Sequence, residues 1–120
     1  MATVNETRTS QYGQTHLHTW ETLTADDDGR AVRIPGAADR SIQVVGTFDG
    51  TSVTLEGSNV PTPSADADWF TLTDPQGDAL TFSSAGGNIV IENTLWIRPH
   101  ATGGGGSTDV DVYVLSRWTR

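Results

Sequence analysis

The stretch Ser41–Phe82 reads SIQVVGTFDGTSVTLEGSNVPTPSADADWFTLTDPQGDALTF, and it predicts short strands separated by turns. Asp49-Gly50 stands between two alternating segments, 41–48 and 52–57, which is a strong signal for a tight β-hairpin. Asp74-Pro75-Gln76-Gly77 has Pro at its second position and Gly at its fourth, as a type I turn prefers. With tidy turns and no convergent reactive side chains, this stretch indicates a binding scaffold rather than an enzyme.

The same pattern continues on both sides of this stretch. Strand-like segments precede it at 17–23 and 30–34 and follow it at 89–91, 95–99 and 109–117, and none has a convincing helical period. Short strands at nearly regular spacing predict an all-β, single-domain antiparallel β-sandwich of jelly-roll or Ig-like type. We expect this sandwich to span residues 17–120. Residues 1–16 are polar and aperiodic, and they predict an extended N-terminal arm that is either mobile or ordered against a neighbouring subunit.

Length and composition limit the classes of protein that the chain can belong to. A chain of 120 residues holds one domain with one modest core. The net charge is −8, from 15 acidic and 7 basic residues, and an acidic surface repels phosphate backbones, so no nucleic acid partner is expected. All basic residues are Arg, and the absence of Lys reflects either a coding bias or adaptation to high salt.

Two further absences shape the expectations. The chain has no Cys, so it has neither disulfides nor a Cys-ligated metal site. No segment approaches the roughly 20 apolar residues of a membrane span. The first residues also lack the basic and apolar regions of a signal peptide. We therefore expect no membrane partner, and either a soluble chain in the cytoplasm or a chain that leaves the cell by another route.

Candidate sites for chemistry are weak. Asp26-Asp27-Asp28-Gly29 groups carboxylates before a glycine, which suits either Ca²⁺ or a solvated turn, although the spacing is not that of an EF-hand. His16 and His18 face the same way on a strand but need a third ligand to hold a metal, so surface or interface histidines are the expectation. No nucleophile-elbow or P-loop motif is present. The sequence therefore predicts no catalytic, cofactor or metal site.

The tryptophans are the best candidates for contact with another molecule. We expect Trp20 and Trp69 to fill the core. Trp96 alternates with the apolar Leu95 and Ile97, and Trp118 follows the last strand, so both are expected at the surface. Exposed Trp residues on a β-sandwich favour an intersubunit contact, and the alternative is a platform that stacks on sugars, as in a carbohydrate-binding module.

From Trp20 to Arg117 the chain resembles small virion proteins of tailed phages. The resemblance lies in four segments: GTFDGTSVTLEGSN (46–59), WFTLTDPQGDALTF (69–82), WIRP (96–99) and TGGGGSTDVDVYVLSR (102–117). These relatives look like head-decoration (cement) proteins. The chain departs from them in a longer loop after Asn59, reading VPTPSADAD (60–68). The loop leaves the strands untouched but alters the surface.

The resemblance implies a non-enzymatic protein that binds the major capsid protein on the outer surface of the head. It would be assembled in the host cytoplasm and act as a homotrimer. The candidate residues for oligomer or capsid contacts lie in the arm, the first strand, the long loop, the WIRP segment and the end of the last strand: Tyr12, His16, His18, Val60, Pro61, Pro63, Trp96, Arg98 and Trp118. A tail or adaptor protein and a carbohydrate-binding module remain the alternatives.

Overall fold

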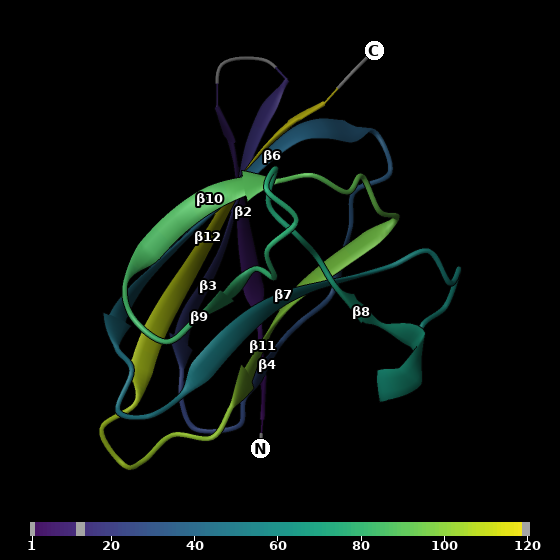
Figure 1. Ribbon diagram of the computed structural model, residues 1–120. Coiled ribbons are helices and arrows are strands. Elements are labelled where there is room, and N and C mark those ends of the chain that lie inside the picture. Colours follow the sequence, from purple (N-terminus) through teal and green to yellow (C-terminus); the bar gives the residue numbers. More distant parts are fainter. Residues whose placement is uncertain (1, 12–13, 119–120) are drawn as a thin grey trace.

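The structure is a computed structural model that describes residues 2–11 and 14–118. It confirms the predicted all-β sandwich, with two mostly antiparallel sheets packed against each other (Figure 1). Among the described residues the one helical element is a short 3₁₀ turn, η1 (Asp66–Asp68).

Each sheet combines strands from distant parts of the chain. Sheet A has the order β1 (Thr3–Val4), β4 (Asp28–Gly29), β11 (Trp96–Thr102), β7 (Ser52–Ser58) and β8 (Phe70–Thr71), while β5 (Val32–Arg33) pairs with β11 and β9 (Thr81–Phe82) pairs with β7. Sheet B has the order β10 (Gly86–Val90), β6 (Ala37–Thr47), β12 (Asp109–Trp118), β3 (Thr15–Leu23) and β2 (Glu6–Gln11).

The core lies between the sheets because alternate side chains of the long strands point inward. In β12 the inward residues Val110, Val112 and Val114 are fully buried, as the alternation predicts. Trp20 is also fully buried, and its indole N–H donates to the carbonyl of Arg30 at 2.9 Å. The prediction that Trp20 fills the core is therefore confirmed.

The Asp49-Gly50 turn forms, but it does not make a hairpin. Both residues have positive φ (48° and 87°), and the N–H of Thr51 donates to the carbonyl of Phe48 at 3.0 Å. The flanking strands β6 and β7 nevertheless belong to different sheets. Both edges of β6 are taken by β10 and β12, so the turn carries the chain from one sheet to the other. The predicted hairpin pairing was wrong because distant strands compete for the same edges.

The second predicted turn is confirmed. The N–H of Gly77 donates to the carbonyl of Asp74 at 3.0 Å, which closes the four-residue turn. The Asp74 carboxylate also accepts the N–H groups of Gln76 and Asp78, each at 2.9 Å. A side chain that bonds to the backbone two residues on is the reason why Asp favours such turns.

The start of the chain is part of the sandwich in the described structure. Strand β1 pairs with β4 in sheet A, and β2 pairs with β3 along the edge of sheet B. Residues 3–4 and 6–11 thus pair within their own chain, where the sequence left open a mobile tail or an arm ordered against a neighbouring subunit. An edge strand needs no apolar alternation, because main-chain hydrogen bonds attach it and one of its edges faces solvent.

Candidate functional site

The predicted contact residues separate into two groups. Trp96, Arg98 and the loop residues gather on the outer face of sheet A, whereas His16, His18 and Trp118 meet where β3 pairs with β12. Tyr12 lies outside the described residues. The structure therefore does not join the candidates into one surface.

Arg98 is the centre of the group on sheet A. Its Nε donates to Glu56 Oε1 at 2.8 Å, and its Nη2 lies 3.4 Å from Asp66 Oδ1. The guanidinium also stacks over the Trp69 ring, with 4.4 Å from Cζ to the ring centroid, a cation–π contact. Trp69 is half-buried against this guanidinium instead of filling the core, so the core prediction for Trp69 was wrong.

The long loop folds back over sheet A. The indole N–H of Trp96 donates to the carbonyl of Pro61 at 3.3 Å, and the hydroxyl of Ser58 donates to the carbonyl of Asp68 at 2.7 Å. Trp96 is consequently half-buried by its own chain rather than fully exposed. Val60 and Pro61 remain exposed, and Pro63 is half-buried, so the loop still presents apolar surface.

The Asp68 carboxylate shapes the end of this loop. It accepts the N–H groups of Ser64 and Ala65 at 2.8 and 3.0 Å. These hydrogen bonds favour the charged form and hold the pKa of Asp68 below its usual value. The loop therefore ends in a turn that side-chain hydrogen bonds stabilise, just before Trp69.

A small hollow of about 170 Å³ lies beside this loop. Its lining includes Thr3, Arg30, Ser64, Trp69 and Arg98. One aromatic ring with hydroxyl and guanidinium groups around it is suited to a small polar ligand.

The carboxylates of the three consecutive aspartates all bind hydrogen-bond donors of their own chain. Asp27 is buried and accepts hydrogen bonds from the N–H and hydroxyl of Thr24, both at 2.8 Å, and from the N–H of Ala2 at 3.0 Å. Burial alone would raise the pKa of Asp27, but these hydrogen bonds lower it below its usual value. Asp26 accepts the N–H of Gly103, and Asp28 pairs with His100.

The solvated-turn interpretation of this cluster was therefore wrong for Asp27. Its carboxylate connects the start of the chain to the turn before β4. Within the described residues, no group of three or more His, Asp or Glu side chains is placed to hold a metal ion.

His18 is only 1% exposed, so its predicted place at the surface was wrong. Its Nδ1 lies 2.6 Å from Glu6 Oε2, and its Nε2 lies 3.4 Å from the hydroxyl of Ser116. The inward phase of β3 carries both His18 and Trp20, so the strand buries the imidazole beside the indole. Polar neighbours on β2 and β12, far apart in sequence, make this burial possible.

A Ser–His–Glu chain has the order of a catalytic triad, but its burial argues against that role. Ser116 and His18 are both fully buried, so a substrate carbonyl has no route to the hydroxyl. We interpret the chain as a polar connection through the core. The Ser116 hydroxyl donates to Nε2, and the Nδ1–H donates to the Glu6 carboxylate.

Lowering the pH from 7 to 5 is expected to lower the urea midpoint of unfolding. Burial lowers the pKa of His18, against the opposing effect of Glu6, so the unfolded chain binds more protons below the ordinary pKa of 6.5. Stability is therefore lost as the pH falls through this value. The charged or titratable neighbours of His18 are Glu6, Arg8 and His16. His18→Gln should show a smaller midpoint change, and an equal change in both proteins would contradict this prediction.

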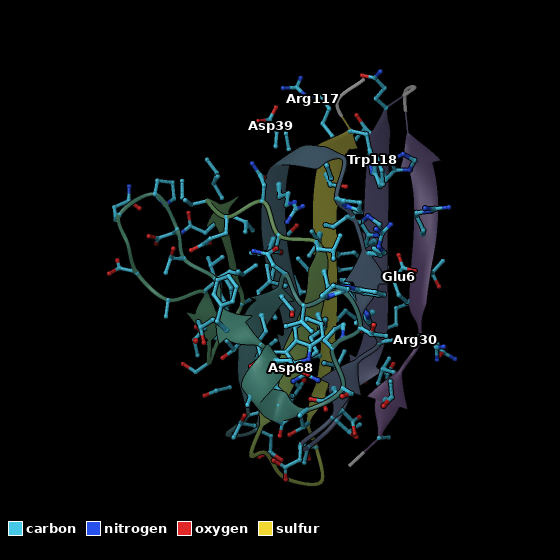
Figure 2. All side chains as sticks on the ribbon, turned by 90° about the vertical axis from the view of Figure 1, so that its right-hand side faces the viewer. Glu6, Arg30, Asp39, Asp68, Arg117 and Trp118 are labelled. Atoms are coloured by element: carbon cyan, nitrogen blue, oxygen red, sulfur yellow. The ribbon has the colours of Figure 1, made fainter. Side chains whose placement is uncertain are left out.

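Trp118 is half-buried at the end of sheet B, so its predicted exposure was only partly right. Its ring meets His16 edge-on, with centroids 5.5 Å apart and planes at 75°. It also lies directly against Gly36, where a Cβ would come within 2.6 Å of the ring. Figure 2 shows Trp118 close to Arg117 and Asp39 at the end of the sandwich.

An exposed apolar surface on sheet B was not predicted. Leu115 and Ile89 stand on the outer face of sheet B with 42% and 56% of their surface exposed. Together with neighbouring residues they form what we call the sheet B patch: Leu17, Ile89, Ile91, Tyr113 and Leu115. A signal was present, because in DVDVYVLSR the residue Leu115 occupies a position that the alternation assigns to solvent.

Comparison with known proteins assigns no family to the chain. No protein-family model matches it, and neither does any curated protein or solved structure. In the part of the chain that the structure describes, no helix is long and apolar enough to cross a membrane.

Proposed function

We propose that the protein is a non-enzymatic structural protein of a tailed-phage virion, a decoration protein that stabilises the head. It binds the major capsid protein on the outer surface of the shell as a homotrimer, after assembly in the host cytoplasm. The resemblance of the four sequence segments supports this proposal. An acidic protein also suits the outside of a shell whose inside holds DNA.

The observation that carries the proposal is the sheet B patch. Leu115 and Ile89 leave an apolar face open to solvent, although the protein as a whole has a net charge of −8. Exposed apolar patches of this kind mark surfaces that contact other proteins. By contrast, on sheet A the charged side chains of Arg98 and Glu56 are paired with each other.

The long loop supplies a second surface for the capsid. Val60 and Pro61 are exposed at its start, on the opposite sheet from the patch. A trimer that presents three such loops would bind by several weak contacts at once, and multivalency converts weak contacts into firm attachment.

The protein is expected in purified virions of the phage that carries its gene, in many copies per particle. Mass spectrometry of the particles measures the copy number, and gold-labelled antibody in electron microscopy locates it. Label on the head supports the decoration function. Label confined to the tail would replace it with the tail or adaptor alternative, and absence from the particles would overturn both.

The hollow beside Trp69 favours carbohydrate binding as a second candidate function. Its aromatic ring, hydroxyl groups and two arginines are the groups that bind sugars in small polar sites. Binding to a glycan array is expected to disappear in Trp69→Ala. It is expected to persist in Trp118→Ala, because Trp118 lies at the end of sheet B, away from the hollow. A wild-type protein that binds no glycan would exclude this candidate.

A further inference from the structure

The sheet B patch has projecting side chains and hollows, so that side chains of a partner protein can insert into it. The strand register places Ile89 opposite Ser41, Ser41 opposite Leu115, and Leu115 opposite Leu17. The small Ser41 thus lies between two large exposed side chains. Hollows of about 630 and 240 Å³ adjoin Leu115, and Ile89 lines the larger one. The same face therefore carries both projecting side chains and the spaces that would receive them.

The two hollows differ in charge, because the lining of the larger one includes Asp39, Arg40 and Arg117. The smaller hollow is lined only by uncharged residues, among them Gln43 and Tyr113. At the rim, Asp39 and Arg117 form an ion pair, which Figure 2 shows at the end of the molecule. A second acidic copy of this chain would meet least electrostatic repulsion at such a face.

We infer that the sheet B patch is the surface through which copies of this chain associate with one another. The inference rests on the proposed function in one respect, the self-association of the decoration protein. Each copy supplies Leu115 and Ile89 as projecting side chains and the hollows beside Ser41 as receiving spaces. In a ring of copies, the projecting side chains of one copy then enter the hollows of the next copy.

The rim ion pair supports a second copy as the occupant. Asp39 and Arg117 are both about two-thirds exposed, with 69% and 65% of their side-chain surface open. An exposed pair contributes little to stability, about 0 to 1 kcal/mol, so its members can exchange partners at small cost. In a closed ring of copies, every Arg117 could face the neighbour's Asp39, and neither of these two side chains would remain unpaired.

Light scattering across a range of concentrations tests this inference with the full-length protein. The wild type is expected to form an oligomer. Leu115→Asp and Ile89→Asp should each raise its dissociation constant by at least about tenfold, because a charge then enters the centre of an apolar contact. Ile89 lies on the edge strand β10, so Ile89→Asp keeps the test decisive if Leu115→Asp fails to fold. Circular dichroism checks the fold of each variant.

Phe70→Asp is the matched control. Phe70 is 44% exposed on sheet A, close to the exposure of Leu115, and this variant should keep the wild-type oligomer. The single variants Asp39→Arg and Arg117→Asp should each associate more weakly, and mixing the two variants should restore association, because neither can form the pair within one copy. Restoration supports exchange of the ion pair between copies.

The outcomes separate this inference from the proposed function. Folded patch variants that keep the wild-type mass, or a control that dissociates equally, would overturn the assignment of the face. A wild type that is monomeric at all concentrations would overturn self-association, and loss of particle binding in its patch variants would assign the face to the capsid protein. Absence of the protein from virions, with a patch-dependent oligomer, would overturn only the phage function.

Discussion

Replacement of Arg40 by Ala is expected to lower the free energy of unfolding by about 3 to 5 kcal/mol. Arg40 is a buried side chain on β6, and its guanidinium connects two segments that are far apart in sequence. It donates to four carbonyl oxygens and one hydroxyl: those of Ile34, Ala37, Glu92 and Thr94, and the Thr94 Oγ1. Without the side chain, buried acceptors lose their donors, and each such loss costs about 1 to 3 kcal/mol.

The hydrogen-bond geometry, rather than the charge alone, explains the expected loss. Burial lowers the pKa of Arg40 to about 10, so the group stays charged at neutral pH. Arg40→Lys keeps a charge but has three donors on one atom, so it should recover only part of the stability. Urea unfolding of these variants measures the effect, with Arg33→Ala as the control at an exposed arginine. A loss below about 1 kcal/mol in Arg40→Ala would show that the two segments do not depend on the Arg40 guanidinium for their stability.

Removal of residues 2–11 is expected to lower the free energy of unfolding by at least about 3 kcal/mol, or the melting temperature by at least about 10 °C. These residues form β1 and β2. Their loss deprives β3 of its edge partner and removes Glu6 from the buried His18. It also leaves the N–H groups of Asp28 and Arg30 without the carbonyls of Ala2 and Val4. Thermal unfolding by circular dichroism measures the effect.

Two variants identify the cause of such a loss. Glu6→Ala removes only the partner of His18 and should cost about 1 to 3 kcal/mol. Thr7→Ala changes an exposed side chain of the same strand and should be nearly neutral. An unchanged melting temperature after removal of 2–11 would instead restore the interpretation of these residues as an arm outside the domain.

Local backbone chemistry was predictable, and pairing between distant strands was not. The turns at Asp49-Gly50 and Asp74–Gly77 form where the sequence places them, because turn residues act on their own backbone. The partners of β6 depend instead on which strand pairing gives the folded chain the lowest free energy. Hairpin geometry lost to β10 and β12, which lie far along the chain.

The candidate residues show the same division. Alternation predicted correctly that Trp96 and Arg98 leave the core, yet it could not show that the loop after Asn59 covers Trp96. His18 lies at an inward position of β3, but a histidine is buried only where hydrogen-bond partners are present for its ring nitrogens. Glu6 and Ser116, which supply them, come from the two neighbouring strands.

The β class, the turn positions and the inward phase of the long strands follow from the sequence alone, because they depend on neighbours along the chain. Long-range strand pairing sets which sheet each strand joins, and so which side chains meet. It buried Arg40 and His18 by bringing donors and acceptors from remote segments. It also left Leu115 and Ile89 together in the open, because no part of the described chain crosses the outer face of sheet B to cover them.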